Sequence, residues 1–451
     1  MKKISLLPLL SFIIIFPFTI NAQNKYTPLL NSYMQAQFDI DHFSGSVLIE
    51  KKGQTIYSSS FGDADKEWHI KNTAQAKYRI GSITKQFTAA CILQLEERGK
   101  LSLNDKLSKY IPDYPRGDKV TLHMLMNQTS GIKDYTEIPD SGAHSDVLPL
   151  APIEIINSFK RAPYNFDPGT QWAYSNSNYF LLGYIIEKVS GEKYSDYLQK
   201  NIIQKAGMKN TGVDRPDSVL QFRAKGYEDA GPYYVNAPYF AIEGPFSAGA
   251  MYSTVNDLDV WIKALMNNKI LLPASVKKMT TPYMGQYGYG LWIDSLSNHK
   301  RVWHNGGIPG FASFVANFPA DDLRIVILSN NESNTPAIAN ALASILFDIK
   351  VINPYVHRKA AINSAVLDNY IGQYVTKNII TLIKKDGKLY RKGNGTEDLE
   401  LIPESATKFF YSDGSDRQIE FEVDKSGKVS KSYIIVGGLK MEMKKVITDV
   451  Y

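Results

Sequence analysis

Apolar residues recur with two different periods along the first 350 residues, and each period predicts a different kind of element. Residues 44–62 predict a β-hairpin, because apolar segments flank the turn dipeptide Lys52-Gly53. Residues 84–97 and 178–190 predict two helices, each followed by a glycine. Their apolar faces consist of Phe87, Ala90, Cys91 and Leu95 in the first helix and Tyr179, Leu182, Gly183, Ile186 and Val189 in the second.

Strand-like segments return near residue 311. Residues 311–318 and 324–329 predict neighbouring strands, and a helix is predicted over 336–349. Strands therefore open and close this part of the chain, while its Pro-, Gly- and Tyr-rich middle favours helices. The pattern predicts an α+β architecture in which the two ends of the domain share one sheet.

The C-terminal part of the chain differs in character. Residues 353–365 are polar and predict a linker. In residues 366–451, apolar and polar residues alternate in short runs separated by turn dipeptides such as Asp386-Gly387. This pattern predicts a small antiparallel barrel or sandwich, separate from the first domain.

The first 22 residues predict an export signal. Lys2 and Lys3 precede an apolar run over residues 6–18, and Ala22 is a small residue suited to a cleavage site. The alternative, a membrane anchor, is disfavoured because this run contains two prolines and is shorter than the roughly 20 residues of a spanning helix. We therefore expect export to the periplasm or secretion, with no transmembrane segment in the mature chain.

Composition excludes several classes of function. The 451 residues carry 51 Lys and Arg against 45 Asp and Glu, without a basic run, so no nucleic-acid partner is expected. The single cysteine, Cys91, excludes internal disulfides and Cys-rich metal sites, and favours a buried core thiol. The seven histidines lack metal-binding spacing, and no phosphate or dinucleotide motif occurs, so neither a metal nor a cofactor is expected.

Ser82 and Lys85 lie three residues apart at the start of the first strong helix, so they share one face of it. A neutral lysine can deprotonate a serine there, and free backbone N–H groups can stabilise an oxyanion. The alternative is a serine near a helix cap beside a solvated lysine.

Two further motifs can supply polar groups. Tyr174 and Asn176 precede the second helix, where a phenol can relay a proton and an amide can hold a carbonyl; the alternative is a packed tyrosine and a capping asparagine. His304, Gly306 and Gly307 fall at a predicted strand edge that a ligand can approach closely; the alternative is an incidental loop histidine. Each motif is weak alone.

Together, the order SxxK, YxN about 90 residues later and HxG about 130 residues further resembles the serine β-lactamase-like superfamily. The similarity is greatest to the branch of class C β-lactamases, DD-peptidases, family VIII esterases and related penicillin-binding proteins. It covers about residues 40–350 and includes further matching segments at 127–131, 174–187, 248–253, 289–292 and 304–330. The resemblance implies a β-lactamase/transpeptidase-like domain over residues 23–352, with an antiparallel sheet flanked by helices and an all-helical region. The C-terminal barrel resembles the lipocalin-like domain of some members.

The resemblance also implies roles. Ser82 would be the nucleophile, Lys85 its proton acceptor and Tyr174 the proton shuttle. Asn176 would bind the substrate amide, and Gly307 and Ser82 would provide the oxyanion-hole N–H groups, with Gly306 beside them in the binding strand. His304 would replace a lysine of class C β-lactamases, giving a weaker and pH-dependent attraction for a substrate carboxylate.

Two hypotheses follow. The first is an exported serine hydrolase that acts through an acyl-enzyme on a D-amino-acid peptide, an ester or, weakly, a β-lactam. The alternative is a non-catalytic or very slowly turning-over penicillin-binding or cell-wall sensor. The expected partner is a small molecule or peptide, for which peptidoglycan is a candidate source, while substrate identity and oligomeric state stay open.

Overall fold

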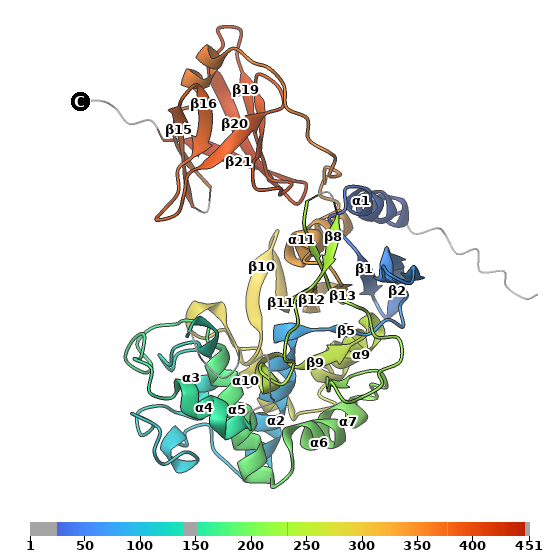
Figure 1. Cartoon of the computed structure of the whole chain (residues 1–451), viewed down its shortest axis with the longest axis vertical. Helices are drawn as coiled ribbons and strands as arrows, with labels where there is room; N and C mark the ends of the chain where they lie inside the picture. Colours follow the sequence, from blue (N-terminus) through green and yellow to red (C-terminus); the bar gives the residue numbers. More distant parts are fainter. Residues whose placement is uncertain (1–24, 139–150, 232, 377, 447–451) are drawn as a thin grey trace, which may run out of the picture.

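In the computed structural model, the described residues are 25–138, 151–231, 233–376 and 378–446. They form a mixed helix and sheet domain and a C-terminal barrel, which lies apart from it at the top of Figure 1. The predicted signal peptide, residues 1–22, lies outside the described residues. Among the residues described, no helix combines the length and the apolar character needed to cross a membrane.

A six-stranded sheet organises the first domain. Its order is β10-β11-β12-β13-β1-β2, and the neighbouring strands are antiparallel. Val47 of β1 lies opposite Ile327 of β13, so the two ends of the domain share the sheet, as predicted. The strands are β1 (Gly45–Lys51), β2 (Gln54–Phe61), β10 (Trp292–Leu296), β11 (His299–Ile308), β12 (Phe311–Phe318) and β13 (Leu323–Ser329).

Both faces of the central strands β1, β12 and β13 are buried, since alternate residues face opposite sides and both sets pack against other elements. Ile49 and Ile327 pack with residues of α1 (Thr27–Asp39) and α11 (Thr335–Leu346), while Val326 belongs to the core shared with the helical region. The sheet therefore separates two helical layers, and the predicted α+β fold is confirmed.

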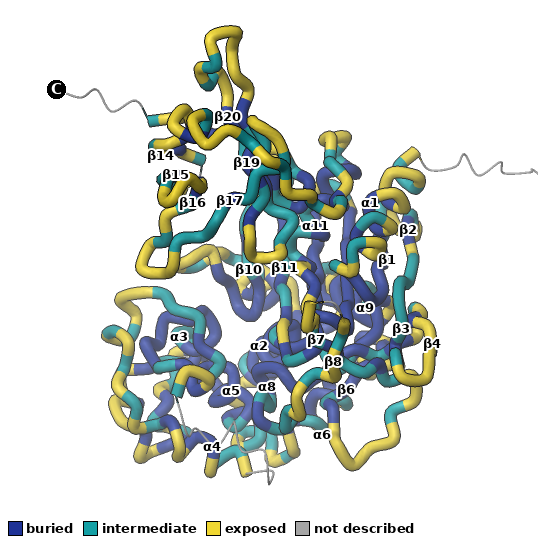
Figure 2. Tube along the Cα trace, turned by 45° about the horizontal axis from the view of Figure 1, so that its top comes forward, coloured by how far each residue is buried: buried dark blue, intermediate teal, exposed yellow. Residues whose placement is uncertain are grey.

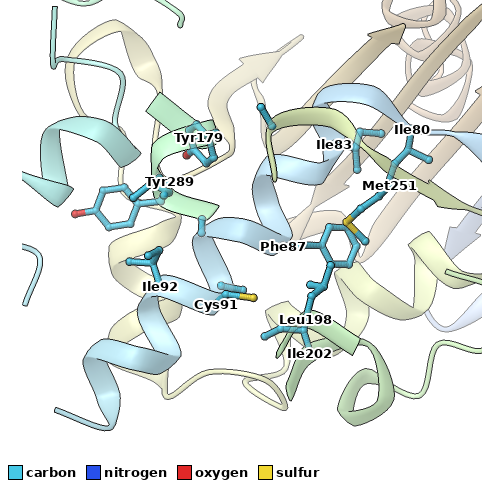
Figure 3. Packing of buried hydrophobic residues seen from close by; sticks show 14 of the residues in the cluster. Ile80, Ile83, Phe87, Cys91, Ile92, Tyr179, Leu198, Ile202, Met251 and Tyr289 are labelled. Atoms are coloured by element: carbon cyan, nitrogen blue, oxygen red, sulfur yellow. The ribbon is translucent and has the colours of Figure 1, made fainter. Parts of the chain in front are cut away.

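Helix α2 (Thr84–Glu97) runs through the centre of the helical region. Every residue from Thr84 to Leu95 is buried, and Phe87 and Cys91 pack with apolar residues from several elements (Figure 3). Cys91 is fully buried and is a core residue, as predicted. Burial also raises the pKa of its thiol. The other helices are α3 (Leu122–Met126), α4 (Pro152–Phe159), α5 (Asn176–Ser190), α6 (Tyr194–Leu198), α7 (Gln204–Ala206), α8 (Phe246–Gly249), α9 (Val255–Met266) and α10 (Pro273–Met279).

The predicted helix limits hold for α2 and differ for two others. Helix α5 begins at Asn176, two residues before the predicted start, because Ser175 is the last extended residue. Helix α11 ends at Leu346 rather than 349, because Asp348 adopts a left-handed φ of 58° that helical backbone does not allow.

Three small sheets connect these layers. Strands β3 (Asp63–Asp65) and β4 (Ile70–Lys71) pair, as do β7 (Tyr227–Asp229) and β8 (Tyr234–Asn236). The third has the order β5-β9-β6, made from Tyr78–Arg79, Met251–Ser253 and Gly212–Val213. In Figure 2, buried residues concentrate around α2, α5 and α8, below the sheet.

The C-terminal strands form a closed eight-stranded barrel, so of the two predicted alternatives the barrel is found. Its core includes Tyr374, Phe409 and Phe421. The strands are β14 (Gly372–Val375), β15 (Ile379–Lys385), β16 (Lys388–Arg391), β17 (Leu399–Pro403), β18 (Lys408–Tyr411), β19 (Gln418–Val423), β20 (Val429–Val436) and β21 (Leu439–Lys445).

The barrel contacts the first domain at the β20–β21 turn. The Tyr33 hydroxyl of α1 donates to the Gly437 carbonyl at 3.3 Å, and the Ile352 N–H donates to the Gly438 carbonyl at 2.9 Å. Residues 350–363, which connect the two units, form neither helix nor strand. The barrel is thus joined near α1 and α11, away from α2 and α5 (Figure 1).

Candidate active site

Ser82 lies in a single 3-10 turn, η1 (Gly81–Ile83), between β5 and α2. Two glycines allow this turn to lie against β11. A Cβ atom on Gly306 would lie 2.0 Å from the Ile80 carbonyl oxygen and 2.9 Å from the Ser82 nitrogen. Gly81 has a φ of +50°, and its Cβ would lie 2.9 Å from the Gly307 nitrogen. Small residues at these positions therefore allow the backbones of Ser82 and Gly307 to lie side by side in the lining of one pocket.

One edge of strand β11 has no β10 partner where η1 contacts it. Strand β10 pairs with His299–Trp303 only, so residues 304–308 have no β10 partner. This arrangement agrees with the predicted strand edge, and it leaves Gly307 on the wall of a pocket of about 250 Å³. Ser82 and Asn176 line the same pocket, together with Tyr135 and Phe240.

Lys85 is fully buried and its ammonium nitrogen has three partners. Nζ lies 3.0 Å from Ser82 Oγ, 2.8 Å from Asn176 Oδ1 and 2.8 Å from the Ala248 carbonyl oxygen. Burial lowers the Lys85 pKa to about 7, although the negative charge of Asp134 acts in the opposite direction. The lysine is therefore partly neutral near pH 7.

The three partners of Lys85 fit a neutral amine. The Asn176 and Ala248 oxygens only accept, so they take the two N–H bonds of an NH₂ group. The remaining lone pair of Nζ then faces the Ser82 hydroxyl, which can donate to it. This geometry prepares Lys85 to remove the Ser82 proton.

Asn176, the first residue of α5, is held by a carboxylate that the sequence did not reveal. Asp134 Oδ2 accepts from the Asn176 backbone N–H at 3.0 Å and from Asn176 Nδ2 at 2.9 Å. Its Oδ1 accepts from the backbone N–H and hydroxyl of Thr136. The Asn176 side chain thus links Asp134 to Lys85, and its second Nδ2–H remains available to a substrate.

Tyr174 lies in the turn that precedes α5. Gln128 holds this turn, accepting from the backbone N–H groups of Ala173 and Ser175. The Tyr174 hydroxyl is buried and faces the Ser82 side chain. Burial raises its pKa, while the Ser82 side chain beside it acts in the opposite direction. Lys85 Nζ lies 4.9 Å from the Tyr174 ring centroid, so phenol, hydroxyl and amine form one cluster.

His304 is buried behind this cluster rather than exposed to the pocket. Its Nδ1 lies 2.5 Å from the Asn305 carbonyl oxygen, which can only accept, so Nδ1 carries the proton. Nε2 then accepts from the Tyr287 hydroxyl at 3.0 Å. Burial, followed by the positive charge of Lys85, lowers the His304 pKa to about 3.

The pH-dependent attraction of His304 for a substrate carboxylate stays a prediction, which the burial and the lowered pKa of this histidine do not favour. A histidine with a pKa near 3 is neutral throughout the pH range in which such an enzyme works. Tyr287, which fixes its tautomer, and Gln128, which holds the Tyr174 turn, were also missed by the sequence analysis.

The neutrality of His304 gives a first prediction. In an NMR titration, the His304 ring nitrogens, assigned by their loss in His304→Gln, should keep the chemical shifts of a neutral imidazole between pH 8 and pH 5, because the pKa lies well below this range. The chemical shifts of an imidazolium at pH 5 would contradict the buried, hydrogen-bonded arrangement.

The sheet, the all-helical region and the Ser82 turn between them define the class of serine β-lactamase-like proteins. A family model described as Beta-lactamase matches residues 31–347, and the chain belongs to this family. Penicillin-binding protein 4* of Bacillus subtilis (strain 168) is 29% identical over 429 residues, which cover 87% of this chain and 92% of that protein.

Two solved structures extend the comparison. The octameric penicillin-binding protein homologue from Pyrococcus abyssi has a TM-score of 0.66 and 26% identity, covering 92% of this chain and 99% of that one. D-amino acid amidase from Ochrobactrum anthropi SV3 has a TM-score of 0.64 and 24% identity, covering 71% and 99%. The amidase supports the fold of the first domain alone, whereas the Pyrococcus protein extends over the barrel.

Proposed function

We propose that this protein is a serine hydrolase that forms an acyl-enzyme on Ser82. One observation carries the proposal: a buried amine with a pKa near 7 lies 3.0 Å from the Ser82 hydroxyl, in a pocket of about 250 Å³. A structural lysine in a core would need a charged partner, whereas Lys85 contacts a hydroxyl, an amide and a carbonyl.

Acylation begins when Ser82 gives its proton to neutral Lys85 and its Oγ attacks the carbonyl carbon of an amide or ester. The N–H groups of Ser82 and Gly307 stabilise the oxyanion. Tyr174, protonated because its pKa is raised, donates its proton to the leaving group as the carbonyl reforms. The Lys85 ammonium then restores the Tyr174 proton.

Deacylation reverses these roles. A water molecule attacks the Ser82 ester and gives its proton, directly or through Tyr174, to neutral Lys85. The proton returns to Ser82 Oγ when the acid leaves, so the enzyme is regenerated without a cofactor. Asn176 holds the substrate amide through its free Nδ2–H, while its Oδ1 keeps Lys85 in line with Ser82.

The substrate class that we propose is a D-amino-acid peptide or an ester, with β-lactams as weak substrates. The neutral His304 supports the ester or an amide without a terminal carboxylate, because it offers no cation for a carboxylate next to the reacting carbonyl. We also propose export, which the predicted signal peptide and the penicillin-binding relatives support. The barrel, whose residues do not line the Ser82 pocket, is proposed to be non-catalytic.

Intact-mass analysis tests the acyl-enzyme. Incubation with penicillin, p-nitrophenyl esters and D-Ala-D-Ala peptides should add one acyl mass on the peptide carrying residues 81–85, followed by its loss as the ester is hydrolysed. The matched control Ser82→Ala should show no adduct. An adduct that persists, with one equivalent of product and then none, supports the sensor hypothesis instead. An unmodified Ser82 peptide with every compound contradicts both.

A further inference from the structure

A second pocket, of about 280 Å³, adjoins the Ser82 pocket. Phe240 and Pro309 line both, so the two pockets lie on either side of these two residues. Nothing in the proposed mechanism uses this second pocket.

Four cations line it, of which Lys225 has carboxylate partners of its own. Arg79 and Arg223 share one carboxylate, that of Asp214, at 2.9 Å and 2.8 Å. Lys77 is half-buried and has no ion pair or side-chain hydrogen bond with any residue in the described ranges. Two positive charges therefore lack a counter-charge from the pocket wall. We call Lys77, Arg79 and Arg223, with the space between them, the cationic pocket.

Other charges nearby do not neutralise the cationic pocket. Lys225, also on its wall, has its own partners, Asp65 at 3.1 Å and Glu67 at 2.5 Å. The Asp214 carboxylate is 1% exposed and needs positive partners itself. Its single negative charge balances only one of the two arginines. A half-buried lysine without a partner costs desolvation energy that an anionic ligand would recover.

The cationic pocket is close to the nucleophile because the chain connects them directly. Arg79 is the last residue of β5, and Ser82 follows three residues later in η1. Three residues span at most about 11 Å between Cα atoms. By the same measure Lys77, five residues before Ser82, lies within about 18 Å, so a substrate whose carbonyl lies at Ser82 needs a spacer of several bonds to bring a group to these cations.

We propose that the cationic pocket binds an anionic group, a carboxylate or a phosphodiester, at the far end of the substrate hydrolysed at Ser82. The inference rests on the proposed function and names its substrate class: an ester or amide that carries a remote negative charge. It assigns to Lys77 and its neighbours the anion recognition that sequence analysis assigned to His304. A planar guanidinium on Arg79 or Arg223 and the Lys77 ammonium suit oxyanions of either kind.

Three p-nitrophenyl octanoates that differ only at the far end test this. The first ends in a carboxylate, the second in the neutral carboxamide and the third in a methyl phosphodiester. The protein should show a kcat/KM about five- to tenfold higher for at least one anionic ester than for the carboxamide. The better anion identifies the kind of substrate, and the ratio should fall as salt is raised, since salt screens charge.

Variants connect the preference to the cationic pocket. Lys77→Gln should lower the anionic-to-neutral ratio at least twofold, because it leaves the two arginines with only one positive charge in excess of Asp214, while Lys77→Arg should keep most of the ratio. The matched control is Lys100→Gln, which also removes one positive charge but at an exposed residue beyond the C-terminal end of α2, about 21 Å of helix from Ser82. Lys100→Gln should keep the unmodified ratio.

The outcomes separate this inference from the proposed function. Hydrolysis of the carboxamide ester with no anionic preference, or a preference that Lys77→Gln leaves unchanged, overturns the cationic pocket and leaves the serine hydrolase standing. If no ester is hydrolysed and Ser82 is never acylated, both proposals fail. Because the readout is a ratio within each variant, a general loss of folded protein cannot imitate the expected result.

Discussion

Replacing Lys85 with alanine should lower kcat/KM for a p-nitrophenyl ester by about 10³-fold or more. The variant removes the amine that lies 3.0 Å from the Ser82 hydroxyl and is placed to accept its proton. Ser82→Ala and Tyr174→Phe should show losses of similar size. Steady-state release of p-nitrophenol measures each effect.

Combining these substitutions should cause little further loss of kcat/KM. Nucleophile, base and proton shuttle act as a unit, so a double variant of Ser82 and Lys85 should be only slightly slower than either single variant. A folded Lys85→Ala protein with near-normal activity would contradict the mechanism. Circular dichroism of each variant serves as the folding control, because Lys85 is buried at the centre of the helical region.

The activity of the unmodified protein should follow the protonation of Lys85. Only the neutral amine accepts the Ser82 proton, so kcat/KM should rise with pH and reach half of its plateau near pH 7. Titration of His304 should add no second change to the pH profile of kcat/KM above pH 5, since the His304 pKa is lowered to about 3.

The nucleophile and its base could be predicted from the sequence because they are local. Ser82 and Lys85 share one helical turn, and the apolar period that defines α2 also gives its limits, Thr84–Glu97. Tyr174 and Asn176 were found through their order relative to Ser82 rather than through any local signal. Their contact with Lys85 depends on how α5 packs against α2, which periodicity does not determine.

The state of His304 could not be predicted for the same reason. A histidine in a sequence has an ordinary pKa until its surroundings are known. Its neutrality depends on burial and on the positive charge of Lys85, 219 positions earlier in the chain. Closure of the barrel is equally non-local, because it requires β14 to pair with β21 across the whole C-terminal domain.

Asp134 is the clearest functional residue that the sequence analysis missed. It follows the predicted segment 127–131, but its partner Asn176 lies 42 positions further on. The turn that it forms with Thr136 is common for aspartates and gives no sign of a catalytic neighbour. Only the packing of this loop against the start of α5 shows that Asp134 orients the amide that holds Lys85.

Asp134→Asn should therefore lower kcat/KM by about 10- to 100-fold and also shift the pH profile. An asparagine would set its NH₂ group against the N–H donors of Asn176 or Thr136, which loosens the amide that aligns Lys85. The Asp134 charge raises the Lys85 pKa, so its removal lowers that pKa further. The rising limb of kcat/KM should consequently move below pH 7, measured over pH 5 to 9.

The direction of this shift separates a positioning role from simple loss of structure. The matched control Asp118→Asn removes a carboxylate that is 64% exposed and forms an ion pair with its neighbour Lys119, and it should change neither rate nor profile. A destabilised protein would lose activity, but the rising limb of its kcat/KM profile would stay at the same pH. A limb that moves above pH 7 in Asp134→Asn would show that the carboxylate does not act on the Lys85 ammonium, because removing a nearby negative charge can only favour the neutral amine.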